Sequence, residues 1–438
     1  WSDEGADKVE AIKAQIKPEE MATIIYTSGT TGNPKGVMLS HSNIVNNAFA
    51  VKEIIPIGDG KTALSFLPIC HIFERSASYS YVHNCVEIVF TGTDNLGGET
   101  GDLQSVKPNF FTTVPRLLEK VYEKIVNKGL DLTGVKRGLF FWALNLGLKY
   151  DWRKNQGPIY NAQLSLANKL IFSKWREALG GNILGIVSGS APLQERLARV
   201  FGAGGITVRE GYGLTETSPV LTYNRFGNED AMLGTVGIPL ENVEIKLADD
   251  GEILAKGPNV MMGYYNKPEE TAEVMTEDGW FKTGDIGEMI DGKFLKITDR
   301  KKQLMKTSGG KYVAPQPIEE KFKESMLIEQ MMVIGEGQKF VSALVVPSFA
   351  NLKDWCGANN IDHSCSDEEL LKKEDVVKKF DEIAGEFNEN FSKVEQIKKI
   401  CLLPKEFTID DGELTPTMKL KRRNILEKYN KEIDGIYS

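Results

Sequence analysis

Short strand patterns alternate with helical patterns through the first two-thirds of the chain, and this alternation limits the fold more than any other feature. Runs rich in β-branched and aromatic residues occur at Met21–Ser28, Thr62–Pro68, Cys85–Phe90 and Phe110–Pro115. Val114–Val126 carries apolar residues at helical spacing. Strands that alternate with helices form a mostly parallel sheet covered by those helices. We therefore predict an α/β fold.

The composition changes twice further along the chain. From about Gly234 to Thr298, short runs rich in Gly and Asp indicate hairpins and a small, distorted antiparallel β-subdomain. From Arg300 onward Lys and Glu are frequent, and 367–391 predicts one long amphipathic helix or two. We predict the α/β part of a large N-terminal domain over 1–230, its antiparallel β-subdomain over 231–300, and a small α+β C-terminal domain over 301–438.

Bulk properties are those of an ordinary globular protein. The 438 residues suffice for two to four domains at roughly 100–200 residues each. The net charge of −8 argues against nucleic acid as the main partner. The five cysteines form no CxxC pair, so neither a disulfide framework nor a zinc site is indicated, and a cytoplasmic setting fits best. No apolar run of about 18 residues predicts a transmembrane helix.

A string rich in Gly, Ser and Thr, Tyr26–His41, follows the first predicted strand. Its glycines let backbone N–H groups point into one concavity, its hydroxyls add donors, and Lys35 adds a positive charge, so the string can cradle a triphosphate. It is not a Walker loop, because Pro34 precedes the lysine and Gly36 follows it. A surface turn without a ligand is the alternative. The predicted contacts are Thr27, Ser28, Gly29, Thr30, Thr31, Gly32 and Lys35.

This string resembles the signature loop of the adenylate-forming superfamily, which includes acyl-CoA synthetases, luciferases and peptide-synthetase adenylation domains. Further stretches match the superfamily in the expected order, and together they cover essentially the whole chain. Three of these stretches look most like long-chain fatty acyl-CoA synthetases, namely the ones that contain HIFER, KTSGGKYVAPQPIE and LTPTMKLKRR. The matching stretches are Leu67–Arg75, Ser188–Leu193, Gly211–Pro219, Lys282–Gly287, Asp299–Glu319 and Leu414–Arg423.

The resemblance implies an AMP-forming ligase. Such an enzyme uses ATP and Mg²⁺ to convert a fatty acid into an acyl-adenylate and then, with coenzyme A as co-substrate, into a thioester. It also implies that the small C-terminal domain is mobile and rotates between the two half-reactions. The alternatives are a ligase for a medium-chain or aryl acid and a catalytically incomplete nucleotide-binding fragment.

The resemblance also implies a sizeable stretch upstream of the phosphate loop. The chain begins without an initiator Met, and its polar start, Trp1–Glu20, lacks the apolar core of a signal peptide. We expect that an upstream part is missing. Gly138–Lys154 is apolar and aromatic, which fits a buried core helix, an acyl tunnel or a peripheral membrane contact. The sequence leaves membrane association and a homodimer open.

The stretch Gly211–Pro219 supplies several candidate contacts. An aromatic ring such as Tyr212 can stack on adenine, and Thr215 and Glu216 can meet phosphate and metal. The resemblance implies that Glu216 helps to bind Mg²⁺, with Thr27 as the second residue near the metal. A hard cation that bridges phosphates needs only one or two protein carboxylates. A turn packed by Tyr212 is the alternative. The nucleotide contacts predicted here are Gly211, Tyr212 and Gly213, with Thr215 and Glu216 as catalytic residues.

The resemblance assigns the remaining contacts. Asp285 and Arg300 share the ribose, and Gly189 and Ser190 border the adenine. His71 lies near the acyl carboxylate, where a histidine can donate a hydrogen bond; a helix-start histidine bonded locally is the alternative. Lys419 contacts the carboxylate and the α-phosphate during adenylation. The remaining predicted residues are Lys302 at the hinge and Ser308, Gly309 and Gly310 beside the pantetheine channel.

Overall fold

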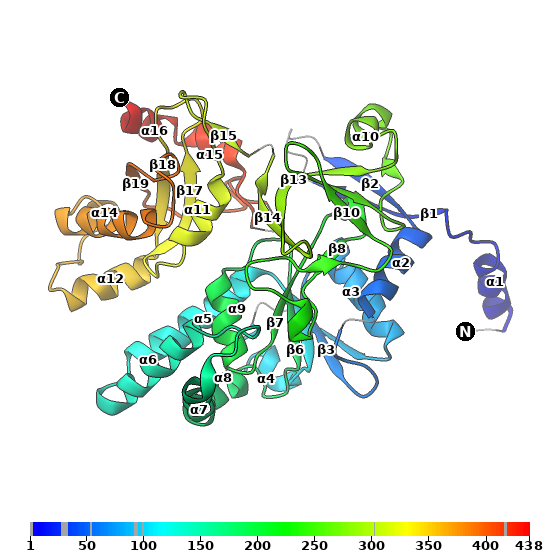
Figure 1. Cartoon of the computed structure of the whole chain (residues 1–438), viewed down its shortest axis with the longest axis horizontal. Coiled ribbons are helices and arrows are strands. Elements are labelled where there is room, and N and C mark those ends of the chain that lie inside the picture. Colours follow the sequence, from blue (N-terminus) through cyan, green and yellow to red (C-terminus); the bar gives the residue numbers. More distant parts are fainter. Residues whose placement is uncertain are drawn as a thin grey trace. The chain divides into compact units, whose positions relative to one another are not determined.

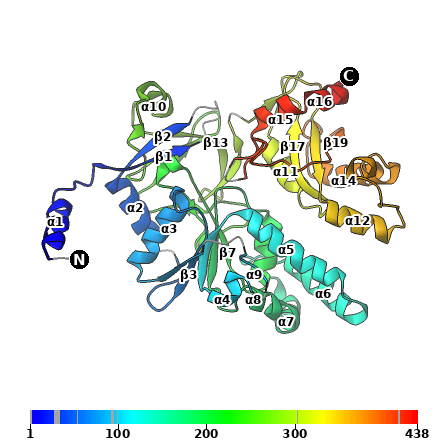
Figure 2. The ribbon, with the colours of Figure 1, turned by 180° about the vertical axis from the view of Figure 1, so that it is seen from behind.

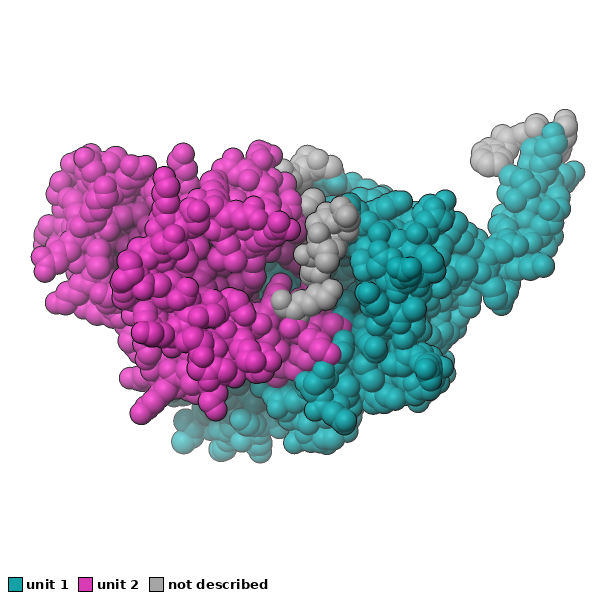
Figure 3. All heavy atoms as spheres, turned by 90° about the horizontal axis from the view of Figure 1, so that it is seen from above, with its two compact units in different colours: residues 1–283, 287–297 teal, residues 284–286, 298–438 magenta. Residues whose placement is uncertain are grey.

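The computed structural model describes residues 3–27, 34–52, 55–91, 95–98, 100–301, 303–415 and 418–438. The chain divides into two units, which Figure 3 colours separately. Unit 1 holds 1–283 and 287–297, and unit 2 holds 284–286 and 298–438.

A seven-stranded sheet lies at the centre of unit 1. The first five strands in its spatial order pair in parallel, while β8 pairs antiparallel with both of its neighbours. This sheet confirms the predicted mostly parallel α/β core. From edge to edge its strands are β4 (Glu87–Phe90), β3 (Thr62–Ser65), β5 (Phe110–Thr113), β6 (Gly185–Ser188), β7 (Val208–Gly213), β8 (Val220–Tyr223) and β9 (Ile238–Pro239).

Helices cover both faces of this sheet. Figures 1 and 2 show α2 and α3 on one side and α5, α6 and α9 on the other. Every residue of β5 and β6 is buried, as expected for strands that are covered on both faces. On the α3 side, Tyr81 packs edge-on against Phe110, with 5.9 Å between ring centroids. The helices of unit 1 are α1 (Asp3–Lys13), α2 (His41–Lys52), α3 (Ile72–His83), α4 (Asp102–Val106), α5 (Pro115–Leu130), α6 (Gly134–Leu148), α7 (Gly157–Ala167), α8 (Ser173–Ala178), α9 (Glu195–Ala203) and α10 (Pro268–Val274).

Two smaller sheets complete the strand pairing of this part of the chain. One contains β1 (Met21–Thr27), β2 (Lys35–Ser40) and β12 (Gly263–Tyr264), all antiparallel. The predicted antiparallel hairpins are present, but β9 joins the seven-stranded sheet and β12 pairs with β2. The second sheet contains β10 (Glu244–Leu247), β11 (Glu252–Lys256), β13 (Phe281–Ile290) and β14 (Phe294–Arg300).

Unit 2 is built on a three-stranded sheet with an apolar core on each face. Strands β17 (Ile328–Ile334) and β18 (Ser342–Pro347) are antiparallel, and β19 (Ile400–Leu402) is parallel to β18. Alternate side chains enter different cores, as the pleat of a strand requires: Val333 enters one and Met332 the other. The remaining elements are β15 (Met305–Lys306), β16 (Tyr312–Val313), α11 (Pro315–Phe322), α12 (Phe349–Ala358), α13 (Asp367–Leu370), α14 (Glu374–Asn388), α15 (Arg422–Lys428) and α16 (Asn430–Tyr437).

Helix α6 contains most of the apolar stretch that begins at Gly138. It buries Phe140, Ala143 and Leu144, whereas Val135 near its start is 80% exposed. The interpretation as a core helix is therefore confirmed for this face. Within the described ranges, no helix is both long enough and apolar enough to cross a membrane.

Candidate functional site

The predicted phosphate loop connects two paired strands. β1 and β2 remain in register as far as Thr27 and Lys35, which lie opposite each other. The Thr27 hydroxyl oxygen is 3.5 Å from the Lys35 carbonyl oxygen. Gly36 follows at a close approach, because a Cβ there would lie 2.8 Å from a methyl carbon of Ile24. The predicted contacts between the two strands, Ser28, Gly29, Thr30, Thr31 and Gly32, lie outside the described residues.

Glu216 is held by the segment that leads into β12. It lies in the 3₁₀ turn Thr215–Thr217, directly after β7. The Tyr264 hydroxyl donates a hydrogen bond of 2.8 Å to Glu216 Oε1. The Met261 N–H donates to the Glu216 carbonyl oxygen, also over 2.8 Å. Backbone and side chain of Glu216 are thus both fixed by residues far along the sequence.

Tyr264 also contacts Lys35. β12 pairs with β2 so that Tyr264 lies opposite Val37, two residues beyond the lysine. Lys35 Nζ is 4.7 Å from the centroid of the Tyr264 ring, within the range of a cation–π interaction. Burial, and then the neighbouring Glu216 carboxylate, raise the pKa of the Tyr264 phenol above its ordinary value. The Lys35–Tyr264–Glu216 cluster therefore joins an ammonium group, a protonated phenol and a carboxylate.

The turn around Glu216 is tightly bonded within itself. The Leu214 N–H donates to Thr217 Oγ1 over 2.9 Å, and Leu214 also donates to the Pro219 carbonyl oxygen. Gly213 has no room for a side chain, because a Cβ there would lie 1.7 Å from the same Pro219 oxygen. Gly213 of the Gly211–Pro219 motif is thus required by the turn that contains Glu216.

Tyr212 lies in the core. It is 8% exposed and belongs to the apolar cluster that contains Leu221 and Leu240. Gly211 pairs with Tyr223 of β8, whose ring would lie 3.1 Å from a Cβ at this glycine. Stacking of Tyr212 on adenine stays a prediction.

The Ser188–Leu193 segment forms a turn at the carboxyl end of β6. The Gly189 N–H donates to the Thr113 carbonyl oxygen over 3.1 Å, and a Cβ at Gly189 would lie 3.1 Å from the Phe73 ring. Ser190 has φ +67°, in the left-handed region. The Leu193 N–H donates to Glu210 Oε1 over 3.2 Å. Burial raises the pKa of Glu210 to about 8 despite that hydrogen bond.

His71 caps the start of α3. Its Nδ1 accepts a hydrogen bond of 3.3 Å from the Phe73 N–H, so the local bond considered as the alternative is present. A neutral imidazole that accepts at Nδ1 carries its proton on Nε2. In a neutral His71 the capping contact therefore places the ring proton on Nε2.

Unit 2 contains the predicted ribose pair. Arg300 Nε lies 3.2 Å from Asp285 Oδ1, and the Asp285 side chain is 5% exposed against 40% for Arg300. The Lys301 N–H donates to the Gly284 carbonyl oxygen over 2.9 Å, which ties β14 to β13 next to this pair. Burial raises the pKa of the adjacent Asp299 to about 6. The Asp285–Arg300 ion pair, whose members come from KTGDIG and DRKK, is thus brought together.

Four further predicted residues of unit 2 lie in exposed turns. Ser308, Gly309 and Gly310 connect β15 to β16, and Gly310 has φ +75°. Lys419 lies in a bridged turn in which its N–H donates to Thr415 Oγ1 over 3.0 Å. Lys302 lies outside the described residues.

The metal that the family resemblance implies needs few protein ligands. Among the described residues, no group of three or more His, Cys, Asp or Glu side chains is placed to hold a metal ion. Mg²⁺ usually keeps several waters and binds through one or two carboxylates plus substrate phosphates. The Glu216 carboxylate, anchored through Oε1, fits this sparse type of site, whereas an all-protein cage does not.

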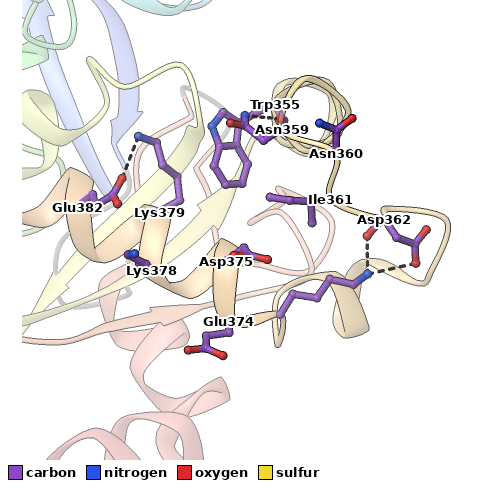
Figure 4. A pocket seen from close by; sticks show the side chains of 11 residues that line it. Trp355, Asn359, Asn360, Ile361, Asp362, Glu374, Asp375, Lys378, Lys379 and Glu382 are labelled. Carbon is purple, nitrogen blue, oxygen red and sulfur yellow. Dashed lines mark hydrogen bonds and ion pairs between the residues drawn. The ribbon is translucent and has the colours of Figure 1, made fainter.

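A cavity of about 710 Å³ in unit 2 contains none of the predicted residues. It lies between the end of α12, the loop after it and the start of α14 (Figure 4). Among its lining residues, Lys373 forms an ion pair with Asp362, and Lys379 forms one with Glu382. Lysines and carboxylates are mixed in its lining, so no single sign of charge attracts phosphates.

Several residues of these sites are not among those predicted from the sequence. Tyr264 belongs to no predicted motif, and its contact with Glu216 spans 48 positions, so only the pairing of β12 with β2 identifies it. Glu210 and Asp299 directly precede predicted residues. Asp299 lies inside the matching stretch Asp299–Glu319, and Glu210 lies one position before Gly211–Pro219, so their positions were a signal that could have been used.

Comparison with known proteins assigns the chain to a family. The AMP-binding enzyme family matches residues 1–265, and the AMP-binding enzyme C-terminal domain matches 302–438. The long-chain-fatty-acid–CoA ligase FadD15 of Mycobacterium bovis is 37% identical over 432 residues, which cover 97% of this chain and 70% of that protein. Long-chain-fatty-acid–CoA ligase 1 of Homo sapiens is 36% identical, over 96% of this chain and 61% of that protein. The chain belongs to the AMP-binding enzyme family, which confirms the predicted resemblance.

Solved structures share the fold. The adenylation domain of a carboxylate reductase from Mycobacterium chelonae aligns with a TM-score of 0.73 at 22% identity, over 96% of this chain and 60% of that one. ATP-bound MatB from Rhodopseudomonas palustris aligns with a TM-score of 0.65 at 23% identity, over 96% of this chain and 70% of that one. The chain thus spans well under the full length of the proteins that it matches.

Proposed function

We propose that the chain is the catalytic part of an ATP-dependent, AMP-forming ligase that converts a long-chain fatty acid into its coenzyme A thioester. The observation that carries the proposal is the Lys35–Tyr264–Glu216 cluster. In it Tyr264 contacts both Lys35, at the end of the predicted phosphate-binding loop, and Glu216, the predicted metal-binding carboxylate. Family membership and the names of the similar ligases support the choice of reaction.

The reaction has two steps. A carboxylate oxygen of the fatty acid attacks the α-phosphorus of ATP, and the bond from that phosphorus to the pyrophosphate oxygen breaks. The coenzyme A thiol, losing its proton, then attacks the acyl carbon, and the bond from carbon to the AMP oxygen breaks. Carboxylate, ATP and thiol become thioester, AMP and pyrophosphate, so no nucleophile from the protein is required.

Residues of unit 1 bind and orient the phosphates. Lys35 and the loop Thr27–Gly32 hold the β- and γ-phosphates, and Glu216 with Thr27 would hold the metal. Mg²⁺, when bound, would neutralise charge on the phosphates as pyrophosphate departs. Thr215 donates to phosphate oxygens from the same turn as Glu216. His71, with its proton on Nε2, orients the acyl carboxylate.

The nucleoside contacts divide between two groups of residues. Asp285 accepts from the ribose hydroxyls, with Arg300 beside it, and the backbone of Gly189 and Ser190 borders the adenine. The Tyr212 ring stacks on the adenine, with Gly211 and Gly213 as the neighbouring nucleotide contacts. The buried Asp285 carboxylate, paired with Arg300 at 3.2 Å, supports this assignment.

Different residues of unit 2 act in the two steps. Lys419 stabilises the charge that develops on the reacting oxygens during adenylation, where a fixed cation acts more strongly than in the ground state. Lys302 is the hinge, and Ser308, Gly309 and Gly310 border the pantetheine channel during thioester formation. The exposed position of both turns in unit 2 is compatible with such alternation.

A thioester assay tests the proposal. Palmitate, ATP, Mg²⁺ and coenzyme A are incubated with this chain and, in parallel, with an upstream-extended chain, and palmitoyl-CoA is quantified by mass spectrometry. The proposal predicts palmitoyl-CoA and an equal amount of AMP. A panel of medium-chain and aryl acids in pyrophosphate exchange measures acyl preference. Absence of thioester from every acid with both chains would contradict the proposal.

A further inference from the structure

Tyr264 is a buried side chain that contacts both the candidate phosphate residue Lys35 and the candidate metal residue Glu216. It is 6% exposed. Its backbone N–H donates to Thr271 Oγ1 over 2.9 Å, and the next residue, Tyr265, donates its N–H to the Gly36 carbonyl oxygen over 2.8 Å. Backbone pairing therefore fixes this ring against β2 before any ligand is present.

The Tyr264 side chain contacts two residues of opposite charge, Glu216 and Lys35. The hydroxyl donates to Glu216 Oε1 at 2.8 Å, while the ring face lies 4.7 Å from Lys35 Nζ. Because the hydroxyl donates to Oε1, the second carboxylate oxygen, Oε2, is the one that we expect to face a cation. The ring face therefore contacts the ammonium group while the hydroxyl contacts the carboxylate.

We infer that Tyr264 is a positioning residue that holds Glu216 ready for Mg²⁺ through its hydroxyl and holds Lys35 ready for phosphate through its ring. This inference rests on the proposed function, since it names the ligands as Mg²⁺ and ATP. The two contacts use different parts of one side chain, and substitutions can therefore separate them.

Two substitutions at Tyr264 separate the contribution of its hydroxyl from that of its ring. Tyr264→Phe removes the hydroxyl and keeps the ring, whereas Tyr264→Leu removes both. Tyr265→Phe is the matched control, because it deletes the hydroxyl of the adjacent, 43% exposed tyrosine. Far-UV circular dichroism and thermal unfolding establish that each variant is folded before it is compared.

Binding is measured by calorimetry without fatty acid or coenzyme A. ATP is titrated in EDTA, and Mg²⁺ is then titrated at saturating ATP. Tyr264→Phe is expected to raise the Mg²⁺ concentration for half-saturation roughly 10-fold, as when a partner that orients a metal ligand is lost, and to leave ATP binding in EDTA within about twofold because its ring retains the cation–π contact. Tyr264→Leu is expected to weaken both, and Tyr265→Phe neither.

The outcomes distinguish this inference from the proposed function. Unchanged Mg²⁺ half-saturation in Tyr264→Phe would overturn the positioning role, even if the wild-type chain forms thioester. The expected pattern in a chain that binds Mg²⁺ and ATP but makes no thioester would support the positioning role and contradict the ligase. Equal weakening of ATP binding in EDTA by Tyr264→Phe and Tyr264→Leu would overturn the separate role of the ring.

Discussion

A single cation, Lys419, distinguishes the two half-reactions of the proposed chemistry. Lys419→Ala is expected to slow adenylation roughly 100- to 1000-fold, the range seen when one preorganised charge-stabilising group is removed. Thioester formation from supplied palmitoyl-adenylate should remain within a few-fold of wild type. Pyrophosphate exchange measures the first step and thioester release the second. Arg423→Ala, which removes an exposed neighbouring cation, is the control. Equal losses in both steps would contradict the alternation.

Glu210 makes the stability of the protein depend on pH. Its carboxyl keeps a proton in the folded state up to about pH 8, whereas its ordinary pKa is near 4.5. Between these values the unfolded state binds fewer protons, so the free energy of unfolding falls as pH rises, by at most about 1.4 kcal/mol per pH unit. This contribution is complete below the unfolded pKa and is lost as pH passes through the folded pKa.

Glu210→Gln removes this dependence and keeps an oxygen to accept from the Leu193 N–H. Urea unfolding between pH 5 and 8 should therefore show wild type losing stability relative to Glu210→Gln as pH rises. Parallel curves for the two proteins across this interval would show that the Glu210 carboxyl titrates normally.

Among the elements, the turn after β7 shows how backbone geometry presents a functional side chain. In Gly213→Ala the new Cβ would lie 1.7 Å from the Pro219 oxygen, so the turn that carries Glu216 must move. We expect a loss of stability at or above the upper end of the roughly 1–3 kcal/mol typical of overpacking, together with weaker Mg²⁺ binding. Gly211→Ala is the control, since its Cβ would lie 3.1 Å from a ring that can adjust. Thermal unfolding that ranks Gly211→Ala as the less stable variant would contradict this explanation.

The sequence predicts elements well where the pattern is local. The strands β3 and β5 fall inside the predicted runs Thr62–Pro68 and Phe110–Pro115, because buried parallel strands are short and rich in β-branched and aromatic residues. The helical segment 367–391 divides in two, since Ser366 and Glu369 form a capping box at α13 and α14 begins separately. The pairing of β12 with β2 could not be predicted, because two residues carry no periodicity and their partners are distant in sequence.

At the scale of the whole molecule, the motifs identify the family while the geometry of single contacts stays hidden. The Asp285–Arg300 pair could be predicted because the matching motifs define both residues. The roles of Tyr264, Glu210 and Asp299 depend on burial and on partners from other elements, which composition does not encode. Family motifs therefore predict the kind of chemistry, and tertiary packing determines which side chains support it.

The hinge role of Lys302 predicts a selective defect. Proline fixes φ near −65° and removes a backbone donor, so Lys302→Pro should limit rotation about this position. Thioester formation from supplied palmitoyl-adenylate is expected to fall at least roughly 10-fold, while pyrophosphate exchange changes little, because restricted hinges act on the conformational step. Lys302→Ala keeps the backbone free and is the control. A loss of the same size in Lys302→Ala would assign the effect to the side chain instead.

In the proposed mechanism a carboxylate oxygen of the fatty acid attacks the α-phosphorus of ATP, and an isotope label follows that oxygen into the products. Palmitate labelled with ¹⁸O in both carboxylate oxygens is incubated with the chain, ATP, Mg²⁺ and coenzyme A, and the nucleotide product is analysed by mass spectrometry. The mechanism predicts AMP that carries one ¹⁸O atom, with unlabelled pyrophosphate and palmitoyl-CoA that retains the other. Thioester formed together with unlabelled AMP, or with ADP and labelled phosphate, would contradict it.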